Sequence, residues 1–215
     1  MKEHLLLLCM TYPNPSRKYS ATVCMAGINE ENEFRRIYPV PYDIFYNREF
    51  HKKQWISYDI LEKGDSRKES YKIRPETIEH YKKITDNDLR IICKEECSDM
   101  EHLWKQKRID GTSLGIIKPD ISKIFIKPRQ PTKREIARNK QTSIDGSSVA
   151  PLDLLDYDVK YKFTCSDNCK GHIAMCLDTE SGQLYRNIIK NTDDPEEIRT
   201  KMEYALLNRL SKKDL

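Results

Sequence analysis

The alternation of hydrophobic and polar residues predicts a strand-rich first half of the chain. Runs with the two-residue period of β-strands occur at residues 5–9, 21–28, 33–38 and 55–60. The polar tip at 29–32 predicts an antiparallel hairpin between the second and third strands. Pro39 and Pro41 are expected to end the third strand, because proline cannot donate to a central ladder. Short strands without long helices between them favour a small barrel or a sandwich.

The pattern changes between residues 85 and 109, where apolar residues recur at roughly helical intervals. Two short helices are the simplest interpretation, and Asp99 is suited to cap the second. Strand patterns return at 113–117 and 121–126, and a helix is expected to start near Thr132.

A polar stretch at residues 139–152 contains Gly and Ser and has no periodicity, so it predicts a linker. Residues 1–138 then form a β-rich domain and residues 153–215 a C-terminal module, with a strand at 159–164 and a helix opened by Asp194. The predicted fold class is α+β: an N-terminal OB-like β-barrel, or two small barrels, followed by a small mixed α/β module.

The apolar run at residues 5–10 is far shorter than the ~20 residues that span a bilayer, so it predicts a buried strand and no membrane partner. The odd number of cysteines, seven, fits a reducing compartment better than a disulfide framework. We therefore expect a cytoplasmic protein.

Positive charge is concentrated in one segment, although the formal net charge is only +4. Between residues 123 and 140 a single acid, Glu135, interrupts seven bases, as is typical of a surface that binds polyanions. The bases expected to contact phosphates are Lys127, Arg129, Lys133, Arg134 and Arg138. A solvated face without a ligand is the alternative.

Aromatic and basic residues are interleaved between residues 34 and 55, a mixture that holds single strands by stacking on bases and pairing with phosphates. Most of these aromatics are expected in the core. Arg36, Tyr38, Lys52 and Lys53 are the residues expected at the surface.

Thiols and an imidazole converge in one short stretch of the C-terminal module. The candidate ligands of a structural zinc ion are Cys165, Cys169, His172 and Cys176. The alternative is a loop without metal, in which Cys176 is a small buried hydrophobe. If an outside ligand is needed, the candidates are Cys93 and Cys97, for which core packing is the other interpretation.

The chain contains no Gly-rich phosphate loop, nucleophile elbow or His-Glu-x-x-His helix. The candidates for catalysis are two carboxylates, Asp178 and Glu180, which would hold a divalent cation in a nuclease. A polar loop without catalytic role is the competing interpretation.

Four short motifs occur in an order that resembles prokaryotic proteins built on a dual OB-type barrel domain. These are residues 23–27, 34–40, 69–71 and 113–119, and the resemblance covers about residues 5 to 127. It implies two small barrels, a fold that often binds single-stranded nucleic acid. The tail resembles a Cys, Cys, Gly-His and Asp-Trp-Glu pattern, in which Thr179 replaces the aromatic residue.

The sequence thus predicts a nucleic-acid-binding protein, for single-stranded or structured DNA or RNA, with a role in a prokaryotic defence or mobile-element system. One alternative is a metal-dependent nuclease or nucleotide-processing enzyme. Another is a protein-interaction subunit whose barrels recognise a partner chain.

Overall fold

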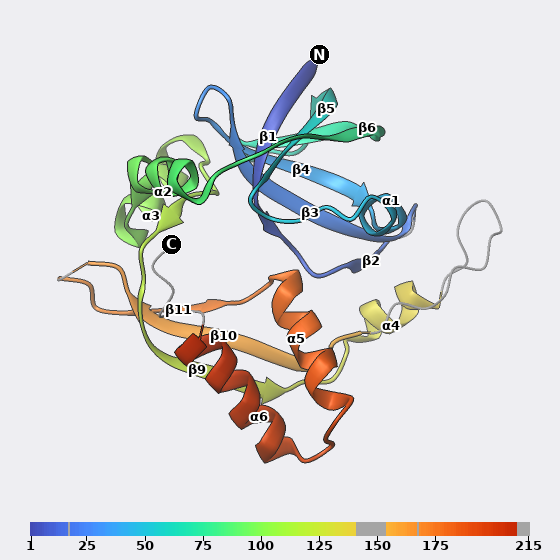
Figure 1. The fold of residues 1–215 in the computed structure, drawn as a ribbon, viewed down its shortest axis with the longest axis vertical. Helices are drawn as coiled ribbons and strands as arrows, with labels where there is room; N and C mark the ends of the chain where they lie inside the picture. The colour runs from blue at the N-terminus through green and yellow to red at the C-terminus, as the bar shows by residue number, and fades with distance from the viewer. Residues whose placement is uncertain (17, 141–153, 167, 210–215) are drawn as a thin grey trace.

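The computed structural model describes residues 1–16, 18–140, 154–166 and 168–209, and its elements form two larger β-sheets, one two-stranded sheet and several helices (Figure 1). The elements of the first half are β1 (Lys2–Met10), β2 (Asn14–Ser16), β3 (Ser20–Asn29), β4 (Phe34–Pro41), α1 (Tyr42–Asn47), β5 (Gln54–Lys63) and β6 (Ser70–Lys83). Those of the second half are α2 (Asp86–Glu95), β7 (Cys97–Ser98), α3 (Met100–Asp110), β8 (Ile116–Ile117), β9 (Asp120–Pro128), α4 (Lys133–Asn139), β10 (Tyr157–Thr164), β11 (His172–Met175), α5 (Thr179–Ile189), α6 (Pro195–Glu203) and a π-helical turn (Tyr204–Arg209). The predicted α+β class is confirmed.

The N-terminal sheet has the strand order β1-β5-β6-β4-β3-β2, and β1 also pairs with β3. The pairings of β1, β5, β6, β4 and β3 therefore form a closed cycle. All are antiparallel except that between β4 and β6, where Arg36 lies opposite Ser70 and Ile37 opposite Tyr71.

The core of this sheet comes from alternate residues of its strands, because successive side chains of a strand point to opposite faces. It contains Leu5, Leu7, Val23, Met25, Ile37 and Ile56, all fully buried. A polar network closes one end of the core. There the buried carboxylate of Glu3 accepts hydrogen bonds from Tyr58 Oη at 2.6 Å, Arg35 Nε at 2.8 Å and Asn29 Nδ2 at 3.0 Å.

The C-terminal sheet has three antiparallel strands in the order β11-β10-β9. Helices α5 and α6 pack against one face of it, and α6 crosses in front of β9 and β10 in Figure 1. Ile124 and Val159 of the sheet form one core with Ile188 and Met202 of the helices. β9 lies before the predicted domain boundary at residue 139, whereas β10 and β11 lie after it. The predicted boundary therefore divides this sheet. Most of the predicted linker, residues 141–153, lies outside the described residues.

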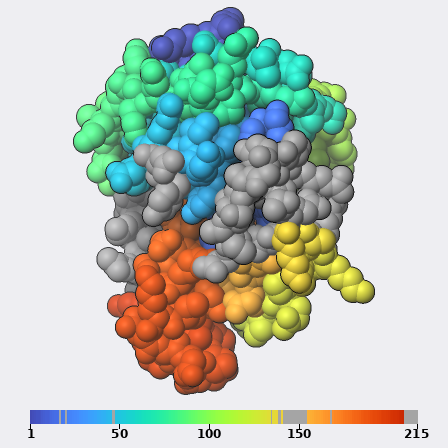
Figure 2. Space-filling view, turned by 90° about the vertical axis from the view of Figure 1, so that its right-hand side faces the viewer, coloured from blue at the N-terminus to red at the C-terminus, as the bar shows by residue number. Residues whose placement is uncertain are grey.

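The two halves stack directly on each other (Figure 2). Thr11, which follows β1, forms a β-bridge with Asp178, and the Tyr12 amide donates to the Leu177 carbonyl at 2.9 Å. On another side, Glu69 Oε1 accepts from the Ser113 amide at 2.7 Å. The arrangement of the halves is thus fixed by contacts from two separate segments of the C-terminal part, one at Ser113 and one at Leu177 and Asp178.

The four strands predicted in the first half are confirmed, as are the hairpin at residues 29–32 and the cap by Asp99, whose side chain accepts from the His102 amide at 2.7 Å. β4 differs from the prediction that its prolines end it, because the strand continues through Pro39 to Pro41. Its pairing with β6 ends at Ile37. The prolines therefore lie where β4 pairs only with β3, and a missing N–H is tolerated on such an edge. In the described part of the chain, no helix has the length and apolar character needed to cross a membrane.

Candidate metal centre

The turn between β10 and β11 brings two thiols and an imidazole together. Cys165 directly follows β10, and His172 begins β11, where it lies opposite Phe163 in the antiparallel ladder. Between them, Gly171 has φ = 91°, a left-handed conformation that a residue with a Cβ rarely adopts. This glycine lets the chain turn back so that Cys169 faces the other two side chains.

A fourth ligand comes from helix α3, far away in the sequence. Asp99 caps this helix and places Glu101 in its first turn. The Met100 amide at the same helix end donates to Cys165 Sγ at 3.4 Å. The positive end of the helix dipole therefore faces the Cys165 sulfur. Burial raises the pKa of the Cys165 thiol, and the hydrogen bond from the Met100 amide partly offsets this increase.

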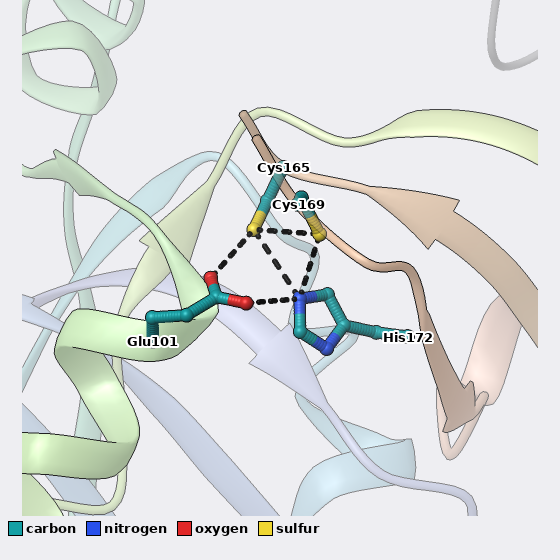
Figure 3. Close-up of side chains that lie close together, drawn as sticks. All are labelled: Glu101, Cys165, Cys169 and His172. Atoms are coloured by element: carbon teal, nitrogen blue, oxygen red, sulfur yellow. Dashed lines mark hydrogen bonds and ion pairs between the residues drawn. The ribbon is translucent and has the colours of Figure 1, made fainter. Parts of the chain in front are cut away.

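The four side chains of Glu101, Cys165, Cys169 and His172 converge on one point (Figure 3). The two sulfurs are 3.8 Å apart, and His172 Nε2 lies 3.5 Å from Cys165 Sγ and 3.0 Å from Cys169 Sγ. Glu101 Oε2 is 3.4 Å from Cys165 Sγ, and Glu101 Oε1 is 3.2 Å from His172 Nε2.

With zinc–ligand bonds of about 2.3 Å to sulfur and about 2.1 Å to nitrogen or oxygen, the edges of a coordination tetrahedron are about 3.8 Å for S···S, about 3.6 Å for S···N or S···O and about 3.4 Å for N···O. Four of the five separations lie within about 0.2 Å of these edges, and the fifth, between Cys169 Sγ and His172 Nε2, is about 0.6 Å shorter. Two soft sulfurs, one imidazole and one carboxylate are also a ligand set suited to zinc. The cluster can therefore hold a metal ion.

The surroundings of the cluster orient its ligands. The Gly171 amide donates to Cys169 Sγ at 3.3 Å, and such N–H···S bonds stabilise thiolate charge. The His172 side chain is only 6% exposed, and its ring lies between Trp104, edge-on at 5.0 Å, and Phe163 at 5.5 Å. Glu101 is 52% exposed and both cysteines are half-buried, so the cluster lies close to the protein surface.

Three of the four predicted metal ligands come together, but Cys176 does not. His172 and Cys176 are separated by four residues along an extended strand, about 13 Å, which is too far to reach one ion. Cys176 instead packs against the core of the C-terminal sheet, and its amide donates to the Val159 carbonyl at 2.8 Å. Among the described residues, the side chain that joins the cluster from outside the hairpin is Glu101, and neither Cys93 nor Cys97 does so.

Several residues predicted to contact nucleic acid are occupied by protein contacts. Arg36 donates to the Ser113 hydroxyl at 3.2 Å, and Arg129 forms two 3.0 Å hydrogen bonds with Glu135. These side chains hold the fold together, which the charge pattern did not indicate.

The other predicted contact residues remain at the surface where the structure describes them. Tyr38, Lys53, Lys127 and Lys133 are exposed. The backbone of Arg134 and Arg138 lies in α4, but their side chains fall outside what the structure describes.

The two carboxylates proposed for catalysis form an ion-pair triad with Lys52. Lys52 Nζ lies 2.7 Å from Asp178 Oδ2 and 3.0 Å from Glu180 Oε2. Burial lowers the pKa of Lys52, but hydrogen bonds and charge from Asp178 and Glu180 outweigh burial and raise it. Asp178 also caps α5 by accepting from the Glu180 amide at 2.8 Å. The triplet is therefore a helix start that ties the two halves together, and not the polar loop of the competing interpretation.

Two protein families match the chain, and each is described as a domain of unknown function. DUF8758 matches residues 1–95 and DUF8757 matches residues 95–214. The boundary coincides with the end of α2, so all four residues of the metal cluster lie in the second match. No curated protein and no solved structure matches the chain.

Proposed function

The chain belongs to the DUF8757 family, whose description states no activity. From the candidate metal centre and the surface charges, we propose that it is a zinc-stabilised protein that binds nucleic acid. The zinc has a structural role in this proposal. Four protein side chains complete a tetrahedron, which is typical of structural centres, whereas catalytic zinc keeps a position open for water. The ion would join α3 to the hairpin of β10 and β11.

One observation supports the nucleic-acid proposal. In the basic segment between residues 123 and 140, the single acid pairs with an arginine of the same segment, whereas three lysines remain exposed. Glu135 pairs with Arg129, and Lys123, Lys127 and Lys133 are exposed. Among the described residues, none of these three lysines takes part in an ion pair. Exposed cations without acidic partners can release counterions from phosphates on binding.

The N-terminal sheet supports an OB-like barrel in this proposal. Its five-strand cycle closes through one parallel pair, β4 with β6, and α1 lies between β4 and β5, as in an OB fold. OB folds bind ligands on the face of their second and third strands, which here are β3 and β4. Arg36 on this face already contacts Ser113. We therefore assign the barrel a supporting role and place the binding surface in the C-terminal half.

The cellular setting belongs to the same proposal. Seven free cysteines favour a reducing cytoplasm, and the expected setting is a prokaryotic defence or mobile-element system. A nuclease is not favoured, because both carboxylates, Asp178 and Glu180, already pair with the ammonium group of Lys52.

The test measures binding of the zinc-loaded protein to labelled single- and double-stranded DNA and RNA by fluorescence anisotropy across a salt series. We expect salt-dependent binding, no cleavage in Mg²⁺ or Mn²⁺, and weaker binding by a Lys127→Glu/Lys133→Glu variant. The charge-matched control is Lys2→Glu/Lys83→Glu, which alters exposed lysines of the other half. Failure of the wild-type protein to bind any of the four polymers at low salt would refute the proposal.

A further inference from the structure

The C-terminal sheet has one face that no helix covers among the described residues. Alternate residues such as Ile124, Val159 and Tyr161 point to α5 and α6, where they form the core. Their neighbours in the strands therefore point to the opposite face. On β11 the residues of that face, Ile173 and Met175, are 62% and 46% exposed, which is unusual for apolar side chains in a sheet.

The residue pairs across the three strands place cations and apolar groups in two rows on this face. In one row, Lys162 lies opposite Lys123 on β9 and opposite Ile173 on β11. In the other, Lys160 lies opposite Phe125 and Met175. Each row therefore combines lysine with at least one apolar side chain, and the rows lie about 7 Å apart, the distance of two residues along a strand.

The row containing Lys123 and Lys162 is unfavourable for the free protein. Like charges placed directly opposite each other destabilise a sheet. In the described part of the chain, no carboxylate pairs with Lys123, Lys160 or Lys162. The nearest acid of this face, Asp158, lies 3.6 Å from Arg129. A bound polyanion would relieve this repulsion.

Phe125 provides the aromatic group. Lys123 Nζ lies 5.2 Å from its ring centroid, so a cation and an aromatic ring are adjacent on β9. Single-stranded nucleic acids are held by this combination, since bases stack on rings while cations follow the backbone. A duplex offers its phosphates to lysines but keeps its base faces inside the stack. The exposed apolar residues on β11 add further surface for unstacked bases.

We propose that this face of β9, β10 and β11 binds single-stranded nucleic acid, with Phe125 stacking on a base and Lys123, Lys160 and Lys162 contacting phosphates. The proposal rests on the proposed function and names the surface and the substrate class. Neither Lys160 nor Lys162 belongs to the basic segment between residues 123 and 140, and β10 joins them to it through its pairing with β9.

The experiment compares wild-type protein with Lys160→Gln/Lys162→Gln and Phe125→Leu in anisotropy titrations with single-stranded and duplex oligonucleotides. Removing two phosphate contacts should reduce the salt slope for single strands by about 1.4. The Phe125→Leu variant, which keeps an apolar side chain, should bind single strands about 5- to 150-fold more weakly and leave duplex binding unchanged. Circular dichroism should show that both variants are folded, and Lys2→Gln/Lys83→Gln is the charge-matched control.

The outcomes separate the inference from the function on which it rests. If wild-type protein binds and both variants bind like it, this face is not the surface, although nucleic-acid binding stands. If duplex and single strands bind equally and Phe125→Leu changes neither, the single-strand assignment is wrong. If polyglutamate competes as well as a single strand, the occupant is an acidic protein segment. If wild-type protein binds no nucleic acid, the proposed function fails first.

Discussion

Replacing Glu101 by Ala tests the candidate metal centre most directly, because among the described residues this side chain is the one candidate ligand from outside the β10–β11 hairpin. Structural zinc sites contribute about 10–16 kcal/mol of apparent binding free energy, or about 2.5–4 kcal/mol for each of four ligands. Glu101→Ala should therefore weaken zinc binding by about 100- to 1000-fold. The Glu101 side chain is half exposed, and within the described residues it contacts Cys165 and His172. Stability without metal should thus change by less than about 0.5 kcal/mol.

The assay is competition for zinc with a chromophoric chelator, with the absorption of the cobalt-substituted protein as a second measurement. Wild-type protein should give the intense visible bands of a tetrahedral cobalt site with thiolate ligands, and Glu101→Ala should weaken or shift them. Glu95→Ala, an exposed carboxylate at the end of α2, is the matched control and should bind zinc like the wild type. If Glu101→Ala keeps wild-type zinc affinity within about threefold, the carboxylate is not a ligand and the tetrahedral argument is wrong.

Two further predictions concern ion pairs. Lys52→Ala leaves the carboxylates of Asp178 and Glu180 without their cation at a partly buried contact. Urea unfolding should therefore show a free energy of unfolding lower by about 1–2 kcal/mol. The control is Lys53→Ala at the exposed neighbouring position, which should lower it by less than half of this amount. Glu135 has its pKa lowered from 4.5 to about 2, mainly by hydrogen bonds from Arg129. Its contribution to stability, about 1 kcal/mol, is therefore full above pH 4.5 and is lost as the pH falls through 2. Glu135→Gln should be less stable than wild type at pH 7, and the difference should shrink as the pH falls from 4.5 towards 2. A difference that stays constant over this range would contradict the assignment.

Local patterns were sufficient to predict many elements of the fold. The strands β1, β3, β4 and β5 follow the two-residue period, and the caps Asp99 and Asp194 mark helix starts by the hydrogen bonds that their side chains accept. β6 was not predicted, since its second half is polar and exposed and Pro75 interrupts it. Its place in the sheet depends on pairing with β5, which is a contact between segments and not a local pattern.

In the metal cluster, too, local spacing predicts some of the residues, and a contact between distant segments supplies the other. Cys165, Cys169 and His172 lie within eight residues, so their convergence could be read from spacing. Glu101 lies 64 residues before Cys165, and an exposed glutamate in a helix carries no local sign of metal binding. Cys176 has the right chemistry, but the extended backbone of β11 carries it out of reach.

The sequence by itself determined the local features of this protein: the strands, the helix caps, the hairpin ligands and the excess of positive charge between residues 123 and 140. These depend on neighbours within a few residues, where backbone geometry relates spacing to position. Tertiary structure alone decided which charges are free. It paired Arg129 and Lys52 with carboxylates, and it placed Lys162 opposite Lys123. Partners for charged groups come from packing between distant segments, and a linear pattern does not contain those distances.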